Sequence, residues 1–217
     1  MPRVFLLSPA NCSGRRAKQV LSPRSSFDLA ERLRSREGAP LGDVFAFVSG
    51  LYFRGKLTYA RRFAAPPDPE CPGVHIITPN SGLRTPDTPI TQIALEGYAG
   101  ADVHPDNAAY RRPLEQSART LDRDVGSDCE VILLGSIASP KYVSILLEIF
   151  GGRLRFPVAF VGRGDMSRGG LLLRSAADGT ELEYAPIGGA ILHGARPPKL
   201  PPLARSATTP RVARRSP

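Results

Sequence analysis

Four short apolar runs, each followed by a loop rich in Gly, Ser, Asn or Pro, constrain the fold of this chain more than any other feature. None of the runs alternates apolar with polar residues, and they occupy positions 4–7, 75–77, 131–134 and 158–161. Such runs are typical of strands buried on both faces, and the helical stretches between them favour parallel pairing. Because ligands bind outside the carboxyl ends of parallel strands, we expect the loops that follow to form one site. These loops are 9–14, 79–87, 135–141 and 162–170.

The pattern predicts the α/β class, with three layers in the order α/β/α around a mainly parallel sheet. Two further apolar runs, 171–174 and 181–184, are joined by a segment that contains Asp178-Gly179. An Asp-Gly pair between apolar runs is a hairpin signal, so an antiparallel hairpin is expected near the C-terminus. A chain of 217 residues with 41% hydrophobic content can bury one core, and residues 1–195 are interpreted as one domain. Residues 196–217 are basic and rich in proline, and we expect a flexible tail there.

Helix signals place the loops between helices and strands. Ser139-Pro140 begins a predicted helix that ends at Gly151-Gly152, and Asp106-Asn107 begins another. Residues 50–55 are bracketed by glycines and are interpreted as a turn, with a helix following over 56–63. The short apolar segment 44–48 fits a helix or a strand equally well.

Net charge and cysteine content bear on partners and compartment. A formal charge of +9 favours a polyanionic partner, either nucleic acid or a nucleotide or other phosphorylated ligand, although the tail carries part of this charge. Three widely spaced cysteines indicate neither a zinc site nor a disulfide framework, so we expect a reducing, cytoplasmic location and no metal or cofactor. The first residues contain too few apolar side chains for a signal peptide, and no apolar run is long enough for a membrane span, so no membrane partner is expected. The sequence does not indicate the oligomeric state.

Several polar side chains of the four loops are candidate ligand contacts. Amide and hydroxyl groups suited to a base or sugar follow the first three strands, at Asn11, Ser13, Asn80 and Ser136. Cations suited to phosphate follow the third and fourth runs, at Lys141, Arg163 and Arg168. The segment 12–16 follows a strand, and its backbone N–H groups and arginines could hold an anion. It lacks the Gly-Lys-Ser/Thr ending of a nucleoside triphosphate loop, and an ordinary turn with solvated arginines explains it as well as anion binding does. Solvation alone also explains Lys141.

Two carboxylates are the candidate catalytic groups. Asp165 lies between Arg163 and Arg168 and should stay ionised, which suits ligand recognition or simple pairing with its neighbours. Asp87 follows Pro86 on a long loop, where it could orient a water molecule or serve as an ordinary turn residue. The three histidines have no recognisable nucleophile or metal partner in the sequence, so a histidine-based triad is not expected.

A resemblance to a known group of domains adds to this interpretation. The motifs that carry it, in chain order, are Leu6 to Ser13, Ser25-Ser26-Phe27, Leu51-Tyr52-Phe53, Ile76 to Leu83 with Pro86-Asp87, and Leu133 to Ser136 ahead of Tyr142. Over residues 3–165 the chain resembles a group of bacterial and archaeal domains that includes the accessory α/β domain of archaeosine synthases and transglycosylase-like proteins. That domain is similar to the uracil-DNA glycosylase fold. The resemblance implies a parallel sheet between helices and a nucleobase or nucleoside as ligand.

The chain departs from the glycosylase pattern in two places. Residues 8–11 contain no carboxylate, and no late His-Pro-Ser segment is present to support an extruded base. Uracil excision by that route is therefore not expected.

Two classes of function remain open at the level of sequence. The first is an enzyme that acts on a nucleobase or nucleoside, free or within DNA or RNA, by glycosidic-bond or base-modifying chemistry. Asp87 or Asp165 would then supply the carboxylate. The alternative is a non-catalytic module that binds nucleic acid or senses a nucleotide. Replacing either carboxylate by Asn separates them, because only an enzyme loses turnover while it keeps binding.

Overall fold

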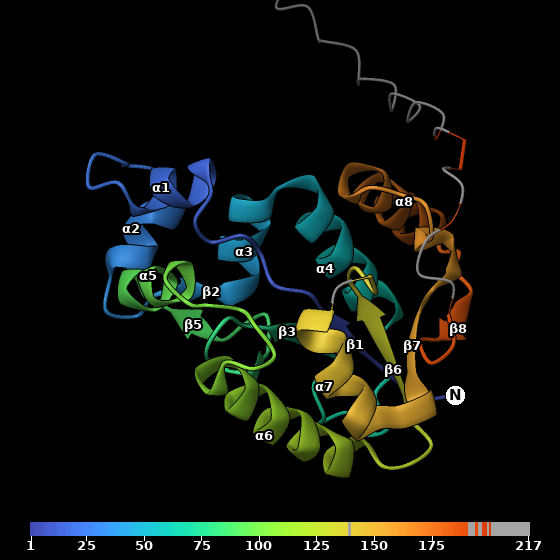
Figure 1. The fold of residues 1–217 in the computed structure, drawn as a ribbon. Helices are drawn as coiled ribbons and strands as arrows, with labels where there is room; N and C mark the ends of the chain where they lie inside the picture. The colour runs from blue at the N-terminus through green and yellow to red at the C-terminus, as the bar shows by residue number, and fades with distance from the viewer. Residues whose placement is uncertain (139, 191–193, 195–196, 199, 201–217) are drawn as a thin grey trace, which may run out of the picture.

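The computed structural model describes residues 1–138, 140–190, 194, 197–198 and 200, and Figure 1 shows its arrangement. A six-stranded sheet in the order β4-β3-β1-β6-β7-β8 forms the centre. The four inner strands are parallel, and the edge strands β4 and β8 run antiparallel to their neighbours. The strands of this sheet are β1 (Arg3–Leu7), β3 (Val74–Ile77), β4 (Leu83–Arg84), β6 (Glu130–Leu134), β7 (Leu154–Pro157) and β8 (Tyr184–Pro186). A separate small ribbon joins β2 (Ala39–Pro40) to β5 (Pro89–Ile90).

Helices cover both faces of the sheet, which confirms the predicted three-layer α/β/α class (Figure 1). One face packs against α1 (Arg15–Leu21), α2 (Asp28–Arg34), α3 (Leu41–Ser49), α4 (Leu51–Phe63), α5 (Gln92–Ala99) and α8 (Asp165–Asp178). The other face packs against α6 (Ala108–Val125) and α7 (Pro140–Phe150). Strand β1 serves both cores, because Phe5 and Leu7 point to the first face while Val4 and Leu6 point to the second.

After β1 and β6 the chain crosses to opposite faces of the sheet, and this difference creates a crevice between the ends of the two neighbouring strands. The two strands are paired in register from Arg3 opposite Glu130 to Leu7 opposite Leu134. After β1 the chain enters α1 on the first face, and after β6 it enters α7 on the second face. Parallel α/β sheets bind ligands at such a point, where the connections diverge.

Three of the four predicted strands are confirmed at β1, β3 and β6, but the fourth lies earlier in the chain than predicted. Strand β7 occupies 154–157, and the apolar run that was predicted as a strand begins with a 3₁₀ turn, Val158–Phe160. The sequence pattern missed β7 because this short strand contains Arg155. The guanidinium of Arg155 donates to Glu130 on the adjacent strand at 2.7 Å, which satisfies both charges.

The predicted antiparallel pair near the C-terminus is present, but different residues form it. Strand β8 pairs with β7, and helix α8 separates them along the chain. Residues 171–174 belong to α8, so the predicted hairpin between 171–174 and 181–184 is wrong. Gly179, with φ of 67°, ends that helix in the left-handed conformation. An Asp-Gly pair suits a helix C-terminus as well as a hairpin turn, which explains the error.

The predicted turn at 50–55 is also wrong, because α4 runs without interruption from Leu51 to Phe63. Gly55 lies inside this helix, where it faces Gly169 of α8. A Cβ atom at Gly55 would lie 2.7 Å from the carbonyl oxygen of Gly169, and one at Gly169 would lie 2.8 Å from the Cα of Tyr52. The two helices therefore cross with their backbones in direct contact, and a side chain at either glycine would force them apart.

The end of the chain lies largely beyond the described part of the structure. The predicted tail, 196–217, falls outside the described residues except for 197–198 and 200, which line a cavity with α8. Among the helices of the described ranges, none combines the length and the apolar character that a bilayer crossing requires.

Candidate functional site

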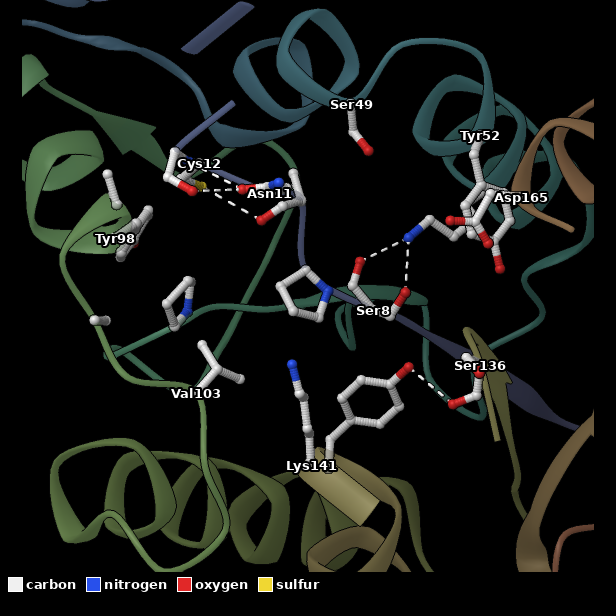
Figure 2. A pocket seen from close by; sticks show the side chains of 18 residues that line it. Ser8, Asn11, Cys12, Ser49, Tyr52, Tyr98, Val103, Ser136, Lys141 and Asp165 are labelled. Carbon is white, nitrogen blue, oxygen red and sulfur yellow. Dashed lines mark hydrogen bonds between the residues drawn. The ribbon is translucent and has the colours of Figure 1, made fainter. Parts of the chain in front are cut away.

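A cavity of about 560 Å³ opens at the carboxyl edge of the sheet, between the loops that follow β1 and β6. Its walls come from residues 8–13 after β1 and from Ser136, Lys141 and Tyr142 after β6 (Figure 2). Helices α4 and α5 also contribute to the walls, and so does Asp165 at the start of α8. This volume lies within the range of small-molecule sites in proteins, about 300–1,000 Å³. The cavity therefore occupies the crevice that the strand order creates.

Lys56 projects from the middle of α4 into the wall of this cavity and is 1% exposed. Its Nζ donates to the carbonyl oxygen of Ser8 at 2.7 Å and to the Ser8 Oγ at 2.9 Å. It also lies 4.7 Å from the ring centres of both Tyr52 and Phe53. Burial lowers the pKa of Lys56 from 10.5 to about 7, although the charge of Asp165 opposes the shift. The amine is therefore neutral in roughly half of the molecules at neutral pH.

Ser8 connects this lysine to the end of the central strand. Its backbone N–H donates to the carbonyl oxygen of Leu134 at 3.1 Å, which continues the β1–β6 pairing by one residue. Gly135 leaves room for this arrangement, because a Cβ atom there would lie 2.8 Å from both the Ser8 Cβ and the Tyr142 hydroxyl. The Tyr142 hydroxyl donates to the carbonyl oxygen of Ser136 at 2.9 Å, which holds the loop after β6 close to Ser8.

Asp165 is the carboxylate of this cavity. It is the first residue of α8, where a negative charge interacts favourably with the helix dipole. Its side chain is 70% exposed, and its Oδ1 lies 3.6 Å from the Nη1 of Arg168, one turn later. The Arg168 guanidinium is 14% exposed and donates to the carbonyl oxygen of Phe160 at 3.2 Å, and this hydrogen bond holds the guanidinium in place. Asp165 is thus a largely exposed group of the cavity lining, whereas Lys56 is a buried one.

The hydroxyl of Tyr52 is a buried polar group that lacks a hydrogen-bond partner among the described residues. Tyr52 is 8% exposed and lines the cavity. Arg168 lies near this hydroxyl, and burial raises the pKa of the phenol. A buried hydroxyl without a partner destabilises the folded chain unless a ligand or water satisfies it. Because Tyr52 lines the cavity, its hydroxyl is a candidate contact for a bound ligand.

The first loop presents donors to the cavity. The Asn11 Oδ1 accepts from the backbone N–H of Ser13 at 3.1 Å and from its hydroxyl at 2.9 Å. This local turn engages the amide oxygen of Asn11. Cys12 also lines the cavity, but burial raises the pKa of its thiol to about 12, so it is not a thiolate at neutral pH.

The structure brings together five of the nine predicted site residues, which are Asn11, Ser13, Ser136, Lys141 and Asp165. Lys141 approaches from the start of α7, on the side opposite α4 (Figure 2). Arg168 lies behind Asp165, as described above.

The other three predicted residues lie elsewhere. Asp87 pairs with Arg61 at 2.9 Å, and its side chain is 82% exposed. Asn80 lines a different hollow beside α6, although its neighbour Pro79 reaches the cavity. Arg163 donates to the carbonyl oxygen of Ala159 at 3.0 Å and lines the cavity formed with 197–198 and 200.

Sequence reasoning missed Lys56, Tyr52 and Tyr98 as site residues. The sequence does contain a signal for Lys56. This residue follows Tyr52 by four positions and Phe53 by three, so it shares their apolar helix face. A lysine on the apolar face of a helix is unusual enough to draw attention.

Within the described ranges, no group of three His, Cys, Asp or Glu side chains is placed to hold a metal ion. Comparisons with protein-family models, with curated proteins and with solved structures find no match to this chain. The geometry of the cavity is therefore the basis on which a function is assigned to this chain.

Proposed function

We propose that this protein is an enzyme that acts on a nucleobase or nucleoside, free or within DNA or RNA, at the glycosidic bond or the base. The observation that carries the proposal is the presence of Lys56 and Asp165 in one cavity at the point where the connections of the sheet diverge. Such a pair holds a proton donor or acceptor and a negative charge against one bound molecule. The resemblance of the motif order described above supports a nucleobase or nucleoside as the class of substrate.

The shape of the cavity suits a base attached to a sugar. Tyr52, Tyr98 and Tyr142 all line it and offer aromatic surface to a planar ring. The amide NH₂ of Asn11 would donate to an acceptor on the edge of the base. Lys141, exposed at the rim, would neutralise a phosphate group of the substrate.

The two ionisable groups would divide the chemistry of glycosidic-bond cleavage. Positive charge develops on the sugar while negative charge develops on the departing base. The carboxylate of Asp165 would stabilise the sugar, and the Lys56 amine, which titrates near neutral pH, would exchange a proton with the base or with water. Tyr52 would donate a hydrogen bond that its hydroxyl otherwise lacks.

Release of free base is the direct test. The full chain is incubated with nucleosides, nucleotides and single-stranded DNA and RNA oligonucleotides, and the products are separated by chromatography. Asp165→Asn should reduce turnover by roughly 10²–10⁴-fold while binding persists. Asp87→Asn is the matched control, since that carboxylate lies outside the cavity and pairs with Arg61. Nucleic-acid binding without turnover, unaffected by Asp165→Asn, would instead favour the non-catalytic module.

A further inference from the structure

We propose that Lys56 is a nucleophile that forms an imine with the C1′ aldehyde of a ribose or 2-deoxyribose 5-phosphate unit held in the cavity. This inference rests on the proposed function and deepens it, because removal of a base from a nucleoside exposes C1′ as a latent aldehyde. Three observations support it: the hydrogen bonds of the amine, the distribution of lysines in the chain, and the groups that face the amine across the cavity.

The hydrogen bonds of Lys56 leave its reactive electron pair unused. A neutral amine has two hydrogens and one lone pair, and the two oxygens of Ser8 accept both hydrogens. The remaining contacts of Nζ are with the rings of Tyr52 and Phe53, which accept no covalent bond. Desolvated lysines of this kind are the amines that attack carbonyl groups in proteins.

The distribution of lysines also favours a chemical role for this residue. The chain contains four lysines among its 29 basic residues, and two of the four, Lys56 and Lys141, line this one cavity. Arginine remains protonated at any pH that a folded protein tolerates. Of the two basic residue types, lysine alone can therefore supply a neutral amine that attacks a carbonyl group.

The groups around the amine match a sugar phosphate. Lys141 and Lys56 line the same cavity from different helices, α7 and α4, so Lys141 would hold the 5′-phosphate while C1′ faces the amine. Asp165 lines the same cavity, its charge acts on the amine, and it would carry protons during the reaction. The Tyr52 hydroxyl would donate to a sugar oxygen.

The reaction balances without any further reagent. The lone pair of Nζ attacks C1′, the carbonyl π electrons move to oxygen, and a carbinolamine forms once a proton passes from nitrogen to that oxygen. Asp165 then accepts the second proton of the amine and delivers it to the hydroxyl, which leaves as water. One amine and one aldehyde thus give one imine and one water.

Reductive trapping tests the proposal. The full chain is incubated at pH 7 with 2-deoxyribose 5-phosphate, with ribose 5-phosphate, or with a single-stranded oligonucleotide that carries an abasic site, each with sodium cyanoborohydride. Hydride from this reagent reduces the imine to a stable secondary amine, which intact mass and peptide mapping locate. The three arms show whether the sugar comes from DNA, from RNA or from a free sugar phosphate.

The adduct should appear on Lys56 in preference to the other lysines. At pH 7 an ordinary lysine is neutral in roughly 0.03% of molecules, about a thousandfold less than the amine of Lys56. We therefore expect Lys56 to carry at least about ten times more adduct than Lys18. Lys56→Met should abolish this adduct, and Lys141→Met should weaken trapping of the phosphate-bearing probes but not of glycolaldehyde, which has no phosphate.

Each outcome decides the proposal. An adduct confined to Lys18, Lys141 or Lys199 in the wild-type chain would overturn it, and this result does not require that any variant folds. Base release without an adduct on Lys56 would overturn the imine but leave the proposed function standing. An adduct on Lys56 without base release from any substrate would support the imine and count against the proposed function.

Discussion

Replacing Lys56 by methionine should change how the stability of this protein depends on pH. Methionine keeps an unbranched side chain between the rings of Tyr52 and Phe53 but removes the ionisable amine. Because burial lowers the pKa of Lys56 to about 7, the folded chain binds fewer protons than the unfolded chain between that value and 10.5. The contribution of Lys56 to stability therefore rises with pH in this window, and the variant lacks this contribution.

The magnitude follows from the width of the window. Each pH unit inside it is worth about 1.4 kcal/mol, and the amine is half protonated at its lower end. Between pH 7 and pH 9 the free energy of unfolding of the wild type should therefore rise by about 2 kcal/mol relative to Lys56→Met. Taking the difference between the two proteins cancels the titration of tyrosines and cysteines that they share.

Guanidinium chloride denaturation at pH 7, 8 and 9 measures this difference. Lys18→Met serves as the control, because Lys18 is exposed on α1 and its removal should leave the difference constant. If the free-energy difference between wild type and Lys56→Met stays flat within about 0.5 kcal/mol, the amine is not desolvated in the folded chain, and the reasoning for a neutral nucleophile fails.

Four other substitutions test the helix crossing and the site. Gly169→Ala should lower the free energy of unfolding by about 1–3 kcal/mol, because the added methyl meets the backbone of α4. Gly170→Ala gains only an ordinary contact at 3.7 Å and should raise the free energy of unfolding by up to about 1 kcal/mol. Thermal denaturation of both variants checks this difference. Gly135→Ala should displace Ser8 and shift the apparent pKa of trapping by cyanoborohydride, and an unchanged trapping profile would contradict the role assigned to this loop. Tyr52→Phe should stabilise the free protein by about 1 kcal/mol, measured by chemical denaturation, because the hydroxyl has no partner among the described residues. The same substitution should weaken ligand binding. A loss of stability would show that the hydroxyl has a hydrogen-bond partner in the free protein.

The sequence predicted the centre of the fold well because the inner strands are buried on both faces. The runs at β1, β3 and β6 contain almost only large apolar residues, and no helix pattern competes with them. Strand β7 was missed because an ion pair with Glu130 replaces apolar burial at Arg155, and pairing across strands is not visible in a local pattern. The same limit explains the misplaced hairpin, because Gly179 suits two different structures and only tertiary packing selects one.

The candidate site could be predicted in position but not in its central residue. The rule that ligands bind at the carboxyl edge located Asn11, Ser136 and Lys141 correctly at one cavity. Lys56 was missed because Gly55 was interpreted as a helix breaker, and the helix face that carries the lysine was cut in two. The contact between Gly55 and Gly169 joins residues that are far apart in the sequence, so nothing local reveals why a glycine is tolerated there.

The crossing of α4 and α8 has a consequence for how the site responds to change. Main-chain atoms, with no intervening side chains, set the distance between these helices at Gly55 and Gly169. Lys56 follows the first glycine directly, and Asp165 lies one turn before the second. Altering core side chains elsewhere should hardly alter the separation of amine and carboxylate, whereas a single methyl group at the crossing acts as a spacer. The distance between the Lys56 amine and the Asp165 carboxylate can therefore be changed by adding single carbon atoms at the crossing, which makes this distance an adjustable quantity for engineering.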